Sequence, residues 1–333
     1  MGYFVSIIVP IYKVETFIER CVRSLFEQSL LQVEYIFVDD CGGDQSFQII
    51  KDLLEEYPHR KSHVRFLQNE RNLGSAETRN RGLAVARGHY ISFCDGDDWM
   101  QINTLEKMYF FAIDGAYDLI WTDFYYNSPH SETISKQDVA TANHGCISAL
   151  LCEKMHGSLW NKLYKRSLFK KFNIQFIAGA DVWEDLCINI QMFFLAENLG
   201  YLPVPFYHYE QSTNHSITSC ISSRKLDDMK TNVVAITNFL QAKTGQQFMR
   251  ELLILKLAAK QTLLFGSDMA GFKLWKITYP ESNSYILQFF ALPIHFRIMG
   301  WCSAKGIWSM IRIWLIIKRF KYKGKEDNKM VKI

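Results

Sequence analysis

Short apolar segments alternate with amphipathic ones through the first 94 residues, and this alternation constrains the fold more than any other feature. Strands are expected over 3–9, 35–38, 64–67 and 90–94. Between them, apolar residues at helical spacing predict helices over 15–29 and 45–57, and a third helix is expected over 75–87. This order is typical of an α/β fold, a mostly parallel sheet with helices on both faces. In such sheets ligands bind at the carboxyl ends of the strands.

Beyond residue 100 the pattern changes. Residues 100–215 are less regular, with further strands expected over 117–121 and 199–202, and from 224 to 320 the pattern is helical. A length of 333 residues corresponds to about two domains. We therefore place a boundary near residue 220. The predicted ranges are 1–219 for an α/β domain, with halves 1–99 and 100–219, and 220–333 for a helical region.

Composition and charge narrow the class of protein. The chain is 48% hydrophobic and 22% charged, which is typical of a globular protein. Its net charge of +4 is too small for a duplex-binding domain, so no nucleic-acid partner is expected. The basic character lies in residues 318–333, which carry seven Lys and Arg against two acids.

Cysteine use and hydropathy indicate the compartment. Eight scattered cysteines include no Cys-x-x-Cys pair, so neither a zinc site nor a disulfide framework is expected. No signal peptide is recognisable, and no apolar run reaches the roughly 18 residues of a spanning helix. We therefore expect a cytoplasmic protein in a reducing environment.

The acidic cluster Asp95-Gly96-Asp97-Asp98 follows a buried strand and is the most informative motif. Three carboxylates so close together repel one another and favour a compensating cation. Carboxylate oxygens suit Mg²⁺ or Mn²⁺, which neutralise charge on a departing phosphate. The alternative is a solvated acidic turn. The strand before the cluster and Trp99 after it favour a site.

Two weaker signals accompany the cluster. Asp39 and Asp40 end the second expected strand. A carboxylate at this place can accept a hydrogen bond from a ribose hydroxyl or a base N–H. The alternative is that it only caps a helix or a turn. Arg79 lies in a helix for which Ser75 is a plausible N-cap. It is a candidate for contact with a nucleotide, and the alternative is an ordinary surface arginine.

Three common motifs are missing. The sequence contains neither G-x-G-x-x-G nor G-x-x-x-x-G-K-[ST], which disfavours dinucleotide oxidoreductases and P-loop NTPases. It also lacks G-x-S-x-G, which disfavours an esterase-type hydrolase.

Taken together, residues 4–218 resemble family 2 glycosyltransferases of the GT-A fold, whose sheet is Rossmann-like. Four segments in this order carry the resemblance. They are the opening strand 5–12, the strand end 35–40, the stretch 72–99 that ends in a DxD motif, and the acceptor-side segment 160–169 followed by Trp183-Glu184-Asp185.

The resemblance implies a binding site for a UDP-sugar donor. The residues that would hold its uracil and ribose are Pro10, Tyr12, Asp39 and Arg79. Asp95, with Gly96 beside it, would lie near the ribose and sugar. Asp97 would bind the cofactor, Mn²⁺ or Mg²⁺.

Glu184 and Asp185 would form the catalytic acidic pair, with Asp185 as the general base. An inverting transfer needs one base that takes the proton of the acceptor hydroxyl as it attacks. Both acids begin an expected helix, whose dipole favours carboxylates there for purely structural reasons. The resemblance decides between the two interpretations in favour of the base.

His208 lies where some relatives place a metal-binding histidine, although a lone histidine among aromatic residues is more often structural. Glu210 replaces a basic residue found in many relatives, so contact with the diphosphate from that position is in doubt. Ser216-Ile217-Thr218 resembles a segment that closes over the diphosphate. The candidate substitutes for the basic residue are His215, Arg224 and Lys225.

The predicted function is an inverting, metal-dependent glycosyltransferase. It would transfer sugar from a UDP-sugar to a hydroxyl of a glycan or lipid-linked acceptor, in capsule, exopolysaccharide or lipopolysaccharide synthesis. One alternative is a nucleotidyltransferase, although the first strand lacks the usual glycine-rich basic loop after it. The other is a non-catalytic nucleotide-binding assembly subunit, against which the intact Asp95, Asp97 and Asp185 argue.

The C-terminal region suggests contact with the inner face of the cell membrane. A helix is expected over about 296–320, with Lys305, Arg312 and Arg319 beside a row of apolar residues. That row is Trp301, Ala304, Trp308, Ile311 and Leu315. Tryptophan beside Lys and Arg suits a helix lying in a membrane interface, and the basic tail would add attraction to anionic lipids. The alternative is a helix packed on the rest of the protein.

Overall fold

The computed structural model describes residues 2–139, 142–211, 223–265 and 268–318. The chain divides into two compact units, Met1–Phe239 and Leu240–Ile333. The division falls within helix α8 (Ser223–Thr244). The boundary expected at 219/220 lies outside the described residues.

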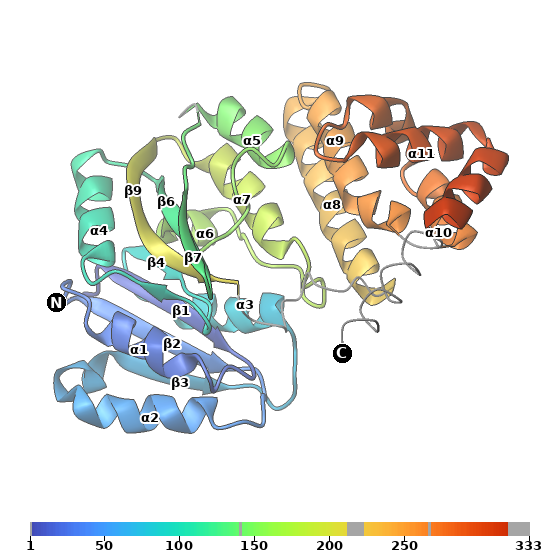
Figure 1. The fold of residues 1–333 in the computed structure, drawn as a ribbon. Helices are drawn as coiled ribbons and strands as arrows, with labels where there is room; N and C mark the ends of the chain where they lie inside the picture. Colours follow the sequence, from blue (N-terminus) through green and yellow to red (C-terminus); the bar gives the residue numbers. More distant parts are fainter. Residues whose placement is uncertain (1, 140–141, 212–222, 266–267, 319–333) are drawn as a thin grey trace, which may run out of the picture. The chain divides into compact units, whose positions relative to one another are not determined.

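A single nine-stranded sheet organises the first unit (Figure 1). Its order is β3-β2-β1-β4-β8-β6-β9-β5, with β7 paired to β6. Strands β3, β2, β1 and β4 are mutually parallel, and β8 joins β4 and β6 in antiparallel pairing. The strands are β1 Val5–Ile11, β2 Val33–Asp39, β3 Val64–Gln68, β4 Tyr90–Phe93, β5 Trp99–Met100, β6 Leu119–Ser128, β7 Ser131–Ser135, β8 Lys162–Lys165 and β9 Leu199–Glu210.

Helices lie on both faces of the parallel strands, which confirms the predicted α/β class. Strand side chains alternate between the faces, so Ile7 joins the core cluster that α1 and α2 complete, while Ile8 faces the other way. On that other face, Gly82 of α3 lies so close that an added Cβ would be 2.4 Å from Ile8. The helices of this unit before α8 are α1 Ile18–Phe26, α2 Ser46–Glu56, α3 Ser75–Val85, α4 Thr104–Asp114, α5 Asn143–Leu151, α6 Arg166–Lys171 and α7 Glu184–Leu195.

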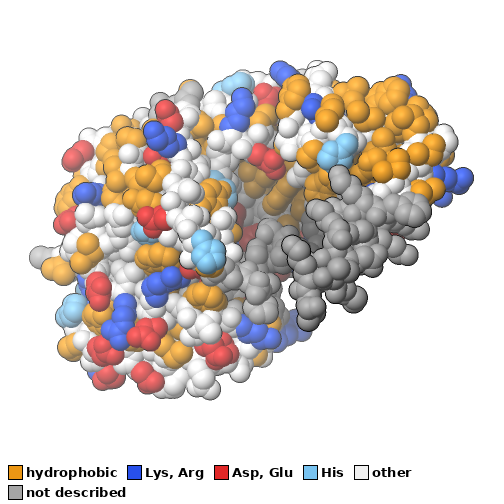
Figure 2. All heavy atoms as spheres, in the orientation of Figure 1, with side chains coloured by type: hydrophobic (Ala, Val, Ile, Leu, Met, Phe, Trp, Pro, Cys, Tyr) orange, Lys and Arg blue, Asp and Glu red, His pale blue; other side chains and the backbone are white. Residues whose placement is uncertain are grey.

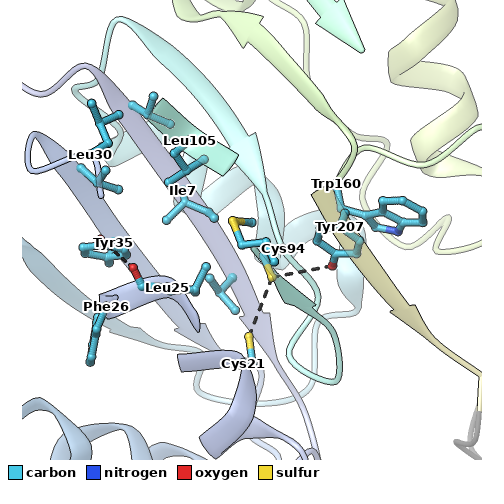
Figure 3. Packing of buried hydrophobic residues seen from close by; sticks show 14 of the residues in the cluster. Ile7, Cys21, Leu25, Phe26, Leu30, Tyr35, Cys94, Leu105, Trp160 and Tyr207 are labelled. Atoms are coloured by element: carbon cyan, nitrogen blue, oxygen red, sulfur yellow. Dashed lines mark hydrogen bonds between the residues drawn. The ribbon is translucent and has the colours of Figure 1, made fainter. Parts of the chain in front are cut away.

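One core cluster includes Leu25 of α1, Ile7 of β1, Tyr35 of β2 and Tyr207 of β9 (Figure 3). Phe26 and Tyr35 pack edge to face at 5.3 Å, and Trp160 stacks on Tyr207 at 4.4 Å. Each large apolar side chain buried in this way contributes about 1.5–3 kcal/mol. The hydroxyl of Tyr207 lies 3.6 Å from Cys94 Sγ, so the core reaches the base of the acidic cluster.

The second unit is helical. It contains the end of α8, then α9 Met249–Lys260, α10 Met269–Ile277 and α11 Ile294–Lys305, with 3-10 segments Gln261–Leu264 and Pro280–Gln288. The single helix expected over 296–320 is wrong. Gly306 has φ +72° and ends α11, and a separate helix begins at Trp308 and is described to Lys318. None of the described helices combines the length and apolar character needed to cross a bilayer.

Candidate active site

The parallel strands bring several predicted site residues to one edge of the sheet. Strands β1 and β2 are in register, so Pro10 lies beside Val38 and Ile11 beside Asp39. Strand β4 pairs with the other side of β1 and leads directly into the acidic cluster. Tyr12, Asp39 and Asp95 therefore follow or end three neighbouring strands. Tyr12 is 43% exposed there and accessible to a ligand.

The two aspartates at the end of β2 have different surroundings. Asp39 accepts hydrogen bonds from the backbone N–H of Gly42 at 3.2 Å and from Gln68 at 3.1 Å. Asp40 accepts from the backbone N–H groups of Leu73 (2.7 Å) and Gly74 (3.0 Å). Asp40 thus fixes the loop that leads into α3, which makes its role structural.

Arg79 on α3 joins carboxylates from both halves of the unit. Its guanidinium lies 2.9 Å from Asp95, 2.7 Å from Glu184 and 3.3 Å from Asp185, and its side chain is buried. Burial opposes the charge, but the three carboxylates outweigh it and raise the pKa of Arg79. The sequence predicts that Arg79 contacts the nucleotide. In the structure its partners are these carboxylates, and a nucleotide contact stays a prediction.

The two acids that begin α7 are distinguished by their hydrogen bonds. Glu184 Oε1 accepts from Ser75 Oγ at 2.8 Å and from Arg79 at 2.7 Å. Burial and the neighbouring Asp185 raise the pKa of Glu184 to about 8. Asp185 Oδ1 is buried and accepts no hydrogen bond from the residues that the structure describes. Asp185 Oδ1 thus meets Arg79 at 3.3 Å without a hydrogen bond, whereas Glu184 Oε1 accepts from two donors.

The acidity of Asp185 suits a base near neutral pH. Burial raises its pKa to about 6, and Asp95 adds to this, while Arg79 and Lys162 act in the opposite direction. The side chain is 24% exposed, so an acceptor hydroxyl can approach it. A carboxylate with a pKa just below the working pH is both ionised and basic enough to take a proton.

The acidic cluster divides into one structural and two accessible carboxylates. Asp98 is fully buried and accepts from the Tyr207 hydroxyl at 2.7 Å and from the Glu210 backbone N–H at 2.8 Å. It therefore anchors the cluster to β9. Asp95 and Asp97 are only partly buried. Burial and the adjacent Asp95 raise the pKa of Asp97 to about 6.

These carboxylates fit a divalent cation held jointly with a ligand. Burial is the larger cause of the raised pKa of Asp97, and repulsion by Asp95 adds to it; a bound cation would offset both. Within the described ranges, no three His, Cys, Asp or Glu side chains are grouped to hold a metal by themselves. Mg²⁺ in particular is commonly bound by one or two carboxylates together with substrate phosphates.

Comparison with known proteins identifies the family. The family described as Glycosyl transferase family 2 matches residues 6–172, more than half of the chain. The chain belongs to this family. Uncharacterized glycosyltransferase EpsJ of Bacillus subtilis (strain 168) is 32% identical over 218 residues, 63% of this chain and 62% of EpsJ. The cholesterol galactosyltransferase of Borreliella burgdorferi is 26% identical over 234 residues, 66% of this chain and 63% of that one. The matches thus span less than two thirds of these relatives' own lengths.

Solved structures support the same fold. Residues 1–349 of S. aureus TarS in complex with UDP-GlcNAc match with a TM-score of 0.70 at 19% identity, over 91% of this chain and 92% of that one. The predicted GT-A fold with a helical C-terminal region is therefore confirmed, as is the predicted family.

His208 lies on β9 opposite Trp99 and is stacked between two rings. Its ring centroid is 4.7 Å from that of Trp99 and 4.5 Å from that of Tyr125. Nδ1 lies 3.2 Å from Asn127 and 3.3 Å from Glu132, and burial lowers the pKa of the imidazole. These contacts account for a structural histidine, and a role as a metal ligand stays a prediction.

Arg20, which no sequence pattern singles out, is the partner of Glu210. The two side chains form an ion pair at 2.9 Å, and Arg20 also donates to the backbone carbonyl of Asp97 at 3.2 Å. Its guanidinium lies 3.6 Å from the ring centroid of Trp99. Glu210, which replaces the basic residue of many relatives, thus holds Arg20 against the segment Asp95–Asp98. No local pattern links residues 20 and 210, because only the fold brings them together.

The sequence gives no sign that Lys162, the first residue of β8, is buried, because the strand Lys162–Lys165 begins and ends with lysine. It is fully buried on β8 and donates to the backbone carbonyls of Ser158 (2.5 Å) and His156 (3.1 Å). Burial lowers the pKa of its amine to about 7, although the negative charge of Asp185 acts to raise this pKa. His215 and 216–218 lie outside the described residues, so those predictions stay as they are.

Proposed function

We propose that this family 2 member transfers a sugar from a UDP-sugar to a hydroxyl of a glycan or lipid-linked acceptor, with inversion at the anomeric carbon. The observation that carries the proposal is the shared guanidinium of Arg79. It contacts Asp95, on the side expected to bind the donor, and Asp185, the expected base. Both carboxylates therefore contact the same guanidinium and lie close together. A donor and an acceptor that are about to react would have to be this close.

In the proposed reaction, Asp185 accepts the proton of the acceptor hydroxyl while the hydroxyl oxygen forms a bond to the anomeric carbon. The bond from that carbon to the diphosphate oxygen breaks, and its electron pair leaves with UDP. Attack opposite the leaving group inverts the anomeric centre. Glu184, held by Ser75 and Arg79, positions the start of α7. A Mn²⁺ or Mg²⁺ held by Asp97 would neutralise charge on the departing diphosphate.

Two relatives support a nucleotide-sugar donor. TarS was solved with UDP-GlcNAc, and the mannosyltransferase PcManGT of Pyrobaculum calidifontis, which matches with a TM-score of 0.52, was solved with GDP-Man and Mn²⁺. A surface-polysaccharide pathway and a location at the inner face of the cell membrane are part of the same proposal. Work at a membrane would suit a lipid-linked acceptor.

The test is nucleotide release from a panel of UDP- and GDP-sugars, with Mn²⁺ and then with EDTA. We expect release from one UDP-sugar, its loss with EDTA, and its loss in Asp97→Asn and Asp185→Asn. The matched control is Asp114→Asn, an exposed aspartate at the end of α4. Release that survives Asp185→Asn would remove the base from the proposal. If calorimetry detects no binding of UDP, a non-catalytic role would replace it.

A further inference from the structure

Exposed apolar side chains are concentrated in the second unit. Of the 21 large apolar side chains that are exposed in the described residues, 13 belong to this unit, although it is less than a third of the chain. They are Met249, Phe265, Leu274, Ile277, Leu287, Phe290, Ile294, Ile298, Trp301, Met310, Ile313, Ile316 and Ile317. Figure 2 shows hydrophobic side chains gathered over α9 and α11, with Lys and Arg at the margins. A patch of this kind marks an interaction site.

Helix α11 has apolar residues on two sides. Met299 and Cys302 face the core of the unit, and Gly300 lies so close to Ile286 that an added Cβ would be 2.8 Å away. Ile294, Ile298 and Trp301 are exposed at spacings of four and three residues, so they form a second stripe. Core packing therefore accounts for one stripe only.

The helix over 308–318 repeats this arrangement. Ile311 and Leu315 are buried, which corrects the expectation that they belong to the row facing a membrane. Met310, Ile313 and Ile317 are exposed instead, at spacings of three and four residues. The apolar surface available to a partner is thus a different one from that predicted by the sequence pattern.

The charge of this unit is strongly one-sided. Residues 240–333 contain 16 Lys and Arg and five Asp and Glu, a net charge of +11, whereas residues 1–239 carry 22 and 29, a net charge of −7. Between 269 and 318 the one acid is Glu281, which is paired with Lys256 at 2.7 Å. Lys273, Lys305 and Arg312 are exposed beside the apolar stripes.

We infer that the exposed residues of α10, Pro280–Gln288, α11 and 308–318, with Phe290, form a lipid face that binds the surface of an anionic bilayer. Its apolar side chains would enter the headgroup boundary, and its Lys and Arg would contact lipid phosphates. A second copy docked through the same unit is a poor occupant, because it would bring a net charge of +11 against +11. Anionic lipid supplies both the apolar boundary and the opposite charge.

The experiment is flotation of the full chain with vesicles. One set is phosphatidylcholine with about 30% phosphatidylglycerol, and the other is phosphatidylcholine alone. We expect binding to the anionic set, at least tenfold stronger than to the neutral set, and weakening as NaCl is raised to about 0.5 M. Equal binding to both sets, or none to either, would overturn the inference.

Two sets of variants separate the apolar and the charged contributions. Phe290→Ser/Ile313→Ser/Ile317→Ser replaces residues that are 80%, 58% and 59% exposed, so folding is expected to survive. Lys305→Gln/Arg312→Gln removes two charges, and we expect each loss to weaken binding about fivefold. The matched controls are exposed residues of the first unit, Leu31→Ser/Ile102→Ser/Phe110→Ser and Lys170→Gln/Lys171→Gln.

The result can be judged independently of the transfer activity. Binding of UDP to the vesicle-free protein is expected to be equal in wild type and in the lipid-face variants. If the controls lose vesicle binding as much as the lipid-face variants do, the inference is wrong. It is also wrong if the chain self-associates in solution and the apolar variant abolishes self-association without changing vesicle binding.

Discussion

At the scale of single residues, Arg79 decides the electrostatics of the site. Three carboxylates from α7 and from the segment after β4 depend on one buried guanidinium. Removing one member of a buried charged group leaves the others uncompensated, which typically costs about 3–5 kcal/mol. The cost depends on pH, because protonation relieves the repulsion.

We expect Arg79→Met to be destabilised by that amount at pH 8 and by less at pH 6. The pKa of Glu184 is already raised to about 8 from an ordinary 4.5, so the folded state holds protons that the unfolded state releases. Stability of this origin is present at low pH and lost as pH rises towards 8. Loss of Arg79 raises the pKa of both Glu184 and Asp185 further and steepens the slope.

Urea unfolding across this pH range measures the effect. The matched control is Arg81→Met on the same helix, where the arginine donates to Asn69 and to the carbonyl of Gln68 rather than to a carboxylate. The same pH slope in both variants would contradict the argument.

The ion pair of Glu210 and Arg20 holds the backbone at Asp97, and neither side chain is expected to touch the donor. Since Arg20 holds the carbonyl of Asp97, we expect Glu210→Gln and Arg20→Met to raise the Mn²⁺ concentration for half-maximal nucleotide release about tenfold. The rate at saturating Mn²⁺ should change much less. Arg23→Met is the control, because Arg23 is on the same helix but pairs with Glu19 and Glu56. An unchanged Mn²⁺ requirement would show that the pair does not position Asp97.

At the scale of elements, the start of α3 depends on a glycine. Gly74 has φ +89° and ψ +166°, a conformation essentially restricted to glycine, and an added Cβ would be 2.0 Å from Asp181. Asp181 in turn accepts from the backbone N–H of Ala76 at 2.9 Å. The backbone conformation of Gly74 and the position of Asp181 at the start of α3 therefore both require that residue 74 has no side chain.

We expect Gly74→Ala to lower the free energy of unfolding by at least the 1–3 kcal/mol that such a backbone typically costs. Gly43→Ala is the matched control, since Gly43 also has positive φ, at +71°, but no atom lies within 4 Å of an added Cβ. Chemical denaturation of the two variants tests this. Equal losses would mean that the contact with Asp181 is not what excludes a side chain.

The same scale shows what the sequence could predict. Strands β1 to β4 are predictable because each is a short, mainly apolar run, and α1 and α2 follow from the spacing of their apolar residues. Helix α3 carries hardly any such periodicity. Strand β7, exposed on nearly all residues, gives no such signal. The pairing of Tyr207 with Asp98 and of Glu210 with Arg20 depends on the register of β9 with β5, which joins residues more than 100 positions apart. The spacing of apolar residues predicts one long helix after residue 296. This spacing contains no sign that Gly306 adopts a left-handed conformation and ends α11.

At the scale of the whole molecule, the chain has two compact units, and every residue of the proposed site lies in the first. Because each unit has its own buried core, we expect more than one unfolding transition in calorimetry. UDP with Mn²⁺ should stabilise only the transition of the first unit, by about 2.7 kcal/mol at a hundredfold excess over Kd. A single transition that shifts as a whole would instead show that the units unfold together.

The two units carry net charges of opposite sign, and these charges act on the molecule before any side chain touches lipid. Near an anionic surface, the negative unit is pushed away and the positive unit is drawn in, so the molecule experiences a torque as well as an attraction. This torque acts within about one Debye length, roughly 8 Å at physiological salt. Orientation would therefore precede contact, and each encounter with the bilayer would begin with the second unit foremost.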